Sequence, residues 1–119
     1  MKKRILVCDD DKQVRLMLTM ALKDIYEIEK AVDGQEAVQK VAEKPIDLII
    51  MDIKMPGIHG LEAIERIREK NKTIPIIIIT AYGLMQDDFV VKSSGIAHFF
   101  TKPIEIKALK EKIFEIIGE

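Results

Sequence analysis

The chain has 119 residues and a formal net charge of −1, from 19 basic and 20 acidic side chains. This length suits one domain with one core, and the balanced charge gives no overall field that would favour nucleic acid or an anionic membrane. With 48% apolar and 33% charged residues, the composition is that of a globular protein. No apolar run is long enough to cross a membrane, and the single cysteine, Cys8, cannot form an internal disulfide. We therefore expect a cytoplasmic domain with no nucleic-acid and no membrane partner.

The chain opens with a short apolar strand and an amphipathic helix. Residues 5–8 form a continuous apolar run, and residues 14–22 repeat apolar side chains at the spacing of one helical face. Leu16 and Met20 fall outside that face. Either the buried face is assigned wrongly, or these two side chains form a docking patch for a helix of a partner protein.

A second strand and helix follow, and then a third strand. Residues 26–31 alternate apolar and charged side chains, which is typical of an edge strand. Asp33 and Glu36 resemble a capping box at the start of the second helix, which Pro45 ends. Residues 47–51 then predict a strand buried on both faces, because the apolar run of residues 48–51 stops at a carboxylate and a Pro-Gly turn.

The second half of the chain repeats this alternation. A third helix is predicted over residues 61–70 and a fourth strand over residues 76–79. Residues 85–92 predict a weak helix, because the apolar spacing there is irregular. Residues 96–100 indicate a fifth strand, and residues 106–117 carry the apolar spacing of a closing helix.

Five alternating strands and helices predict an α/β domain with a parallel sheet and helices on both faces. Of the common doubly wound orders, five strands suit the flavodoxin-like order 2-1-3-4-5, which places the strand of residues 26–31 at an edge. Ligands of such folds bind beyond the carboxyl ends of the strands, at the switch point between the first and third strands. We therefore predict a flavodoxin-like (βα)5 single domain over residues 1–119.

Four of the five strands end in side chains that can take part in chemistry: Asp9 and Asp10, Asp52, Thr80 and Lys102. A parallel sheet brings these ends to one edge. Three crowded carboxylates raise one another's pKa values unless a cation joins them. Oxygen ligands in that number suit Mg²⁺ better than zinc. We therefore expect these acids to share a magnesium ion.

A carboxylate, a divalent cation, an ammonium and a hydroxyl together suit a phosphoryl group, whose transfer depends on positioning and charge neutralisation. Asp52 can act as the nucleophile and take the group as an acyl phosphate. The sequence contains no Gly-rich phosphate loop, so a nucleotide site is not expected. The donor should then be another protein.

These motifs resemble the receiver domain of bacterial two-component response regulators over the whole chain. The residues that carry the resemblance are Val7-Cys8-Asp9-Asp10-Asp11, Met51-Asp52-Ile53-Lys54-Met55-Pro56-Gly57, Thr80-Ala81 and Lys102-Pro103. The resemblance implies that Asp52 accepts a phosphoryl group from a phosphohistidine of a sensor histidine kinase.

The resemblance also implies roles for the surrounding residues. Mg²⁺, or Mn²⁺ in its place, would be held by Asp9 or Asp10, by Asp52 and by the backbone carbonyl of Lys54. Thr80 and Lys102 would each bind a phosphoryl oxygen.

Phe99 matches the position of an aromatic residue that turns inward with Thr80 as a switch, although Phe99 has no polar tip. The Lys102–Pro103 bond is often cis in relatives. His59 stands where relatives carry Asp or Asn, and we expect the turn to survive because His tolerates a left-handed conformation.

Within the family, the chain most resembles stand-alone receivers of the sporulation phosphorelay type, through Lys54-Met55-Pro56-Gly57 and Thr80-Ala81-Tyr82-Gly83. It ends one helix after Lys102-Pro103, so we expect no output domain. Such a receiver relays its phosphoryl group to a downstream histidine phosphotransfer protein and catalyses its own phosphotransfer and dephosphorylation. A phosphatase is a further expected partner. If Leu16 and Met20 form a docking patch, a helix of the kinase is its expected occupant. The near alternative is a chemotaxis-type regulator that binds a target protein when phosphorylated.

The sequence is less consistent with three functions other than that of a phosphorylated receiver. Asp9 and Asp11 have the Asp-x-Asp spacing of dehalogenase-type phosphatases, but the short chain leaves no room for a cap insertion and Asp52 would have no role. Flavin binding is disfavoured because three aspartates would repel the FMN phosphate. A receiver-like module that is never phosphorylated is disfavoured because the acceptor set is intact.

Overall fold

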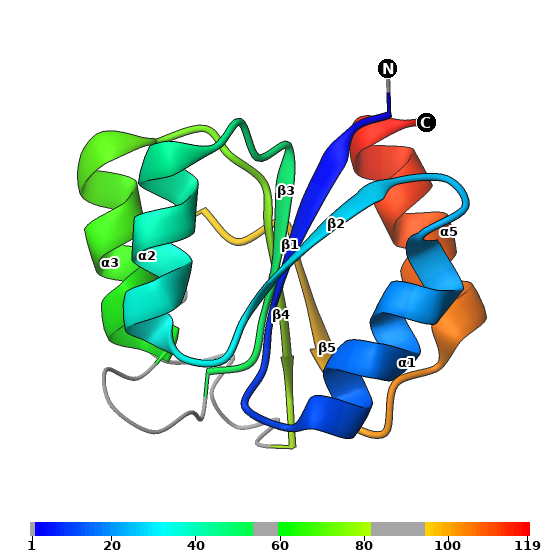
Figure 1. The fold of residues 1–119 in the computed structure, drawn as a ribbon. Helices are drawn as coiled ribbons and strands as arrows, with labels where there is room; N and C mark the ends of the chain where they lie inside the picture. The colour runs from blue at the N-terminus through cyan, green and yellow to red at the C-terminus, as the bar shows by residue number, and fades with distance from the viewer. Residues whose placement is uncertain (1, 54–59, 82–94) are drawn as a thin grey trace.

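The computed structural model describes residues 2–53, 60–81 and 95–119. Five parallel strands form one sheet in the order β2-β1-β3-β4-β5, with helices on both faces (Figure 1). The strands are β1 (Arg4–Cys8), β2 (Glu27–Ala31), β3 (Leu48–Met51), β4 (Ile76–Thr80) and β5 (His98–Thr101). The helices are α1 (Lys12–Leu22), α2 (Gly34–Glu43), α3 (Gly60–Lys70) and α5 (Ile106–Ile117).

The predicted flavodoxin-like fold is confirmed, including the strand order and the edge position of β2. The last strand begins at His98, two residues later than predicted. The helix predicted over residues 85–92 lies outside the described residues.

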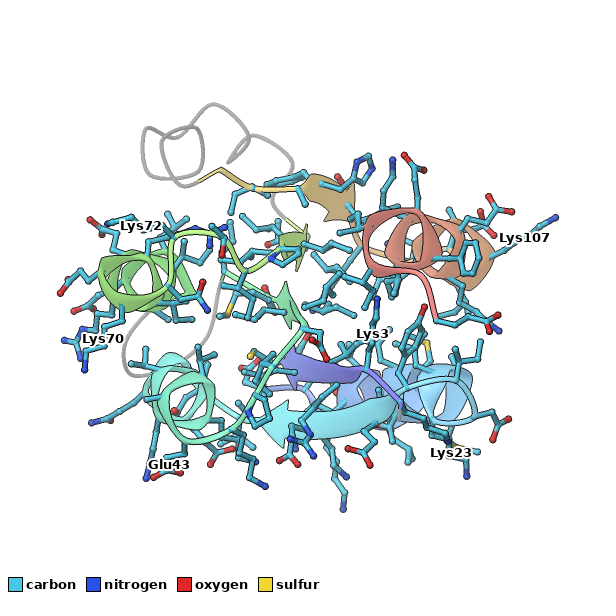
Figure 2. All side chains as sticks on the ribbon, turned by 90° about the horizontal axis from the view of Figure 1, so that it is seen from above. Lys3, Lys23, Glu43, Lys70, Lys72 and Lys107 are labelled. Atoms are coloured by element: carbon cyan, nitrogen blue, oxygen red, sulfur yellow. The ribbon has the colours of Figure 1, made fainter. Side chains whose placement is uncertain are left out.

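The sheet lies between two layers of helices, with α2 and α3 on one face and α1 and α5 on the other (Figure 2). Successive residues of β1 point to opposite faces, so Leu6 packs in one core cluster and Val7 in the other. Every residue of β3 and β4 is buried. This two-sided burial explains why these strands read as uninterrupted apolar runs.

Helix α1 begins after an aspartate that caps it. The Asp11 side chain accepts a hydrogen bond from the Gln13 N–H at 2.9 Å, which satisfies one of the open donors of the first turn. The buried face carries Leu18, while Leu16 and Met20 are 55% and 60% exposed. Leu18 and Leu22 of the predicted face are buried, but Met17, which the apolar spacing also places on that face, is 39% exposed. A docking role for Leu16 and Met20 stays a prediction.

Helix α2 begins with the predicted acidic pair in a modified arrangement. The Asp33 side chain accepts from the Glu36 N–H at 2.8 Å, as a capping box requires. The Glu36 carboxylate accepts instead from the N–H of Val32, one residue earlier than in the usual box. The helix ends before Lys44, whose extended backbone is the conformation that a following proline favours.

Both chain ends lie on the side of the molecule opposite the carboxyl ends of the strands (Figure 1). The Tyr26 hydroxyl donates to the carbonyl of Gly118 at 2.6 Å, and the Lys3 ammonium donates to the carbonyl of Ile117. These bonds attach the end of α5 to the start of the sheet. The opposite edge is therefore formed by the turns that leave the strands.

Candidate functional site

Backbone hydrogen bonds beyond the strand ends align the predicted site residues at one edge. The Asp52 N–H donates to the carbonyl of Cys8 at 2.9 Å, and the Asp9 N–H donates to the last residue of β2 at 3.2 Å. On the other side of the site, the Lys102 N–H donates to the carbonyl of Thr80 at 2.8 Å. Parallel pairing thus continues past each strand and fixes the residues that follow it.

The three predicted acids meet at this edge. Asp9, Asp10 and Asp52 each offer a carboxylate oxygen, and these oxygens lie within 4.8 Å of one another. Asp9 and Asp52 are buried, with 3% and 5% exposure, whereas Asp10 is exposed. Folding therefore brings carboxylates from the β1 and β3 ends together, as the sequence predicts.

The Lys102 ammonium lies between the two buried acids. Its Nζ donates to Asp9 Oδ2 at 2.9 Å and to Asp52 Oδ2 at 3.0 Å. Burial acts to lower the pKa of Lys102, but the bonds to the two carboxylates outweigh it and raise the pKa above its usual value. The side chain therefore stays charged at neutral pH. Thr80, on the neighbouring strand end, is fully buried.

The charge at this edge fits a divalent cation. Burial raises the pKa of Asp9, the nearby charge of Asp52 adds to this, and the bonds from the Asp11 N–H and Lys102 act against it. Three carboxylates face one ammonium, so negative charge remains to be neutralised. Closely spaced oxygen ligands of this kind suit Mg²⁺. The backbone carbonyl of Lys54, the fourth predicted ligand, lies outside the described residues.

The predicted switch residue Phe99 is partly buried and packs against the core on the α2 and α3 side. It pairs with Ile78 in the sheet, two residues before the pair formed by Thr80 and Thr101. Its switch role stays a prediction. The Lys102–Pro103 bond is cis. His59 and Tyr82 lie outside the described residues.

Two features of the site are not evident from the sequence. Arg15 Nη1 donates to the backbone carbonyl of Asp9 at 2.7 Å. Gly60 approaches the β3 end so closely that a Cβ there would lie 2.6 Å from the carbonyl oxygen of Asp52. An arginine one turn after a cap and a glycine opening a helix are the only sequence signals of these contacts, and both are weak.

Comparison with known proteins assigns the class. The family model of the response regulator receiver domain matches residues 5–114. The chain therefore belongs to this family. Sporulation initiation phosphotransferase F of Bacillus subtilis (strain 168) is 31% identical over 114 residues, which are 95% of this chain and 92% of that protein. The solved structure of the response regulator protein TrrA from Thermotoga maritima, in complex with Mg(2+)-BeF, has a TM-score of 0.88 at 39% identity, and the match covers 96% of this chain and 98% of that one.

Longer proteins also contain a related segment. The CAI-1 autoinducer sensor kinase/phosphatase CqsS of Vibrio cholerae is 36% identical over 116 residues, which are 94% of this chain but 17% of that protein. Within the described ranges, no helix combines the length and the apolar character that crossing a membrane requires.

Family membership and geometry both disfavour the rival phosphatase. In the structure both carboxylate oxygens of Asp9 accept bonds, one from the Asp11 N–H and the other from Lys102. The Asp11 side chain serves as the helix cap. The second member of the Asp-x-Asp pair is therefore used to begin a helix, and the family match favours Asp52 as the phosphoacceptor.

Proposed function

We propose that this chain is a response regulator receiver that accepts a phosphoryl group on Asp52 from a phosphohistidine of a sensor kinase. The observation that supports this most directly is the Lys102 ammonium bonded to both Asp9 and Asp52, with Asp10 in the same cluster of carboxylates. A cation-binding acid pair and a fixed amine are the groups that phosphoryl transfer to a carboxylate requires.

In the proposed reaction an Asp52 carboxylate oxygen attacks phosphorus as the P–N bond of the phosphohistidine breaks. The electron pair of that bond returns to the imidazole nitrogen, and Asp52 becomes an acyl phosphate. Lys102, which lies 3.0 Å from Asp52 Oδ2, neutralises an oxygen of the transferred group, and the Thr80 hydroxyl donates to another. Asp9, Asp10 and Asp52 would hold Mg²⁺, which when bound supplies further charge neutralisation.

The downstream step is proposed from similarity. The chain matches sporulation initiation phosphotransferase F over nearly the full length of both proteins. That relative is named a phosphotransferase, so we propose that Asp52 in turn donates its phosphoryl group to a histidine phosphotransfer protein.

Phosphorylation is tested with a small donor. The protein is incubated with acetyl phosphate and MgCl₂, and its intact mass is measured. We expect one added phosphoryl group in the wild type and in Asp24→Ala, which removes an exposed acid far from the site, and none in Asp52→Ala or in excess EDTA. Borohydride trapping should place the acyl phosphate on Asp52. Label on Asp9 would instead support the phosphatase.

The relay is tested on the phosphorylated protein. Purified, labelled protein is mixed with a histidine phosphotransfer domain or with a variant of that domain that lacks its acceptor histidine. Label that moves only to the intact domain supports the relay. Label that stays on Asp52 supports the chemotaxis-type alternative.

A further inference from the structure

Arg15 makes a contact that the phosphoryl-transfer scheme does not use. Its guanidinium, from the first turn of α1, reaches back over the loop and donates from Nη1 to the carbonyl oxygen of Asp9 at 2.7 Å. Helical side chains lean toward the helix N-terminus, so a residue at this position can reach the loop that precedes the helix. The arginine backbone is itself fixed, since its N–H donates to Asp11 and its carbonyl accepts from Thr19.

The accepting oxygen belongs to the peptide that joins two of the acids. A peptide unit is planar, so the Asp9 carbonyl, the Asp10 nitrogen and the Asp10 Cα move as one body. A bond that holds the carbonyl oxygen therefore also orients the backbone that carries the Asp10 side chain. Asp9 is further fixed through its N–H and both carboxylate oxygens, whereas the Asp10 side chain is exposed.

The position of Arg15 is unfavourable for the helix alone. The N-terminal end of a helix carries partial positive charge, which disfavours cations there. The first turn of α1 carries Lys12 and no acidic side chain. A local electrostatic conflict of this kind is expected where a residue serves a site rather than the helix.

We propose that Arg15 is a positioning residue, which holds the Asp9–Asp10 peptide so that both carboxylates are presented with Asp52 to a divalent cation. The inference rests on the proposed function, because the cation is the one required for phosphoryl transfer. Partners that orient metal ligands commonly change metal affinity by about 10-fold to 100-fold when they are removed.

The sign of the effect separates positioning from simple electrostatics. Removal of a positive charge near a cation site should tighten cation binding if charge alone matters. Loss of the bond to Asp9 should weaken cation binding, because the two ligands are no longer held. The two explanations of Arg15 therefore predict opposite changes in Mg²⁺ affinity.

The test is calorimetric titration of MgCl₂ into the protein without any phosphoryl donor, since the chain has no tryptophan to report binding by fluorescence. We expect Arg15→Gln to bind Mg²⁺ about 10-fold more weakly than the wild type, and Arg15→Lys, which keeps a charged donor, to stay within about 3-fold. Lys12→Gln removes the same charge from the same helical turn and should match the wild type or bind slightly more tightly. Equal or tighter binding by Arg15→Gln overturns the proposal.

A second measurement uses the wild type and so does not depend on the folding of any variant. Guanidinium NMR signals of Arg15 should show slowed rotation of the Nη groups both without and with Mg²⁺, because the bond to Asp9 persists. Averaged Arg15 signals in both states overturn the proposal. Neither measurement uses a phosphoryl donor. If Mg²⁺ binding depends on Arg15 as expected but the wild type takes no phosphoryl group, the proposed function alone is refuted.

Discussion

Lys102 donates to two buried aspartates that follow different strands, β1 and β3. Without a metal, the Lys102 ammonium supplies positive charge to both carboxylates. Buried carboxylates are costly when they lose their counter-charge. Lys102 and a divalent cation should therefore compete for the same oxygens in the resting site.

This competition predicts the behaviour of Lys102→Met. The variant should lose roughly 2 kcal/mol of unfolding free energy without metal, less than for a fully buried pair because Lys102 is partly exposed. Its Mg²⁺ affinity should rise, because the ammonium no longer occupies the carboxylates. Urea unfolding and calorimetric titration measure the two effects.

Lys112→Met is the matched control, since Lys112 pairs with an exposed glutamate of α5. It should change stability by no more than about 0.5 kcal/mol. A Lys102→Met protein as stable as the wild type in EDTA would show that the ammonium does not balance the buried acids.

Cys8 illustrates a residue that lies near the site without a chemical role. It is 1% exposed, and burial raises the pKa of its thiol further above neutrality. The thiol therefore stays protonated, and Cys8 serves as a residue of the core.

At the scale of secondary-structure elements, the start of α3 approaches the end of β3. The Gly60 N–H donates to the carbonyl of Ile53 at 3.1 Å. A Cβ at Gly60 would lie 2.4 Å from the Cα of Ile53 and 2.6 Å from the carbonyl oxygen of Asp52. Both neighbours are backbone atoms, so only displacement of the β3 end could relieve the clash.

Gly60→Ala should therefore disturb the phosphoacceptor through the backbone. We expect a loss of about 1–3 kcal/mol of unfolding free energy, as for other overpacked sites, and slower phosphorylation by acetyl phosphate in the protein that remains folded. Urea unfolding and intact mass against time measure these effects.

Gly95→Ala separates this steric effect from backbone strain. Gly95 has a φ of 65°, but a Cβ there meets no atom within 4 Å. It should lose about 1 kcal/mol from the left-handed conformation and phosphorylate at the wild-type rate. Equal phosphorylation rates in the two variants would show that the close packing of Gly60 against β3 does not affect Asp52.

At the scale of the whole molecule, the parallel sheet gathers the site from both halves of the chain. Lys102 is bonded to Asp9, which lies 93 residues away in the sequence, and to Asp52, which lies 50 residues away. A ligand that binds these residues binds only the folded chain, so it should stabilise the whole domain.

Magnesium should accordingly raise the unfolding free energy of the wild type. At a free concentration 100 times its dissociation constant, the expected gain is about 2.7 kcal/mol. Asp10→Asn should keep the metal-free stability within about 0.5 kcal/mol, because Asp10 is exposed, and lose most of the gain. Urea unfolding with MgCl₂ and with NaCl of equal ionic strength measures the difference. An equal gain in both proteins would exclude Asp10 as a ligand.

The sequence alone determined the strands and helices and their order, because local apolar spacing indicates how a strand is buried and which face of a helix packs inward. The continuous run of β3 and the alternation before β2 predicted a central and an edge strand. The strand ends predicted that Asp9, Asp10, Asp52, Thr80 and Lys102 share one edge, since parallel strands all end on the same side. The start of α2 was predictable for a similar reason, because a cap such as Asp33 acts within one turn.

Only the tertiary structure decided which groups touch. Three contacts depend on distances between segments that no local pattern encodes. They are the two hydrogen bonds from Lys102 to Asp9 and Asp52, the hydrogen bond from Arg15 to a backbone oxygen, and the close packing of Gly60 against β3. Such contacts arise when packing fixes the crossing of strands and helices to within an ångström. The local pattern therefore predicts the element and the face on which a side chain lies. The packed fold decides which other groups that side chain contacts.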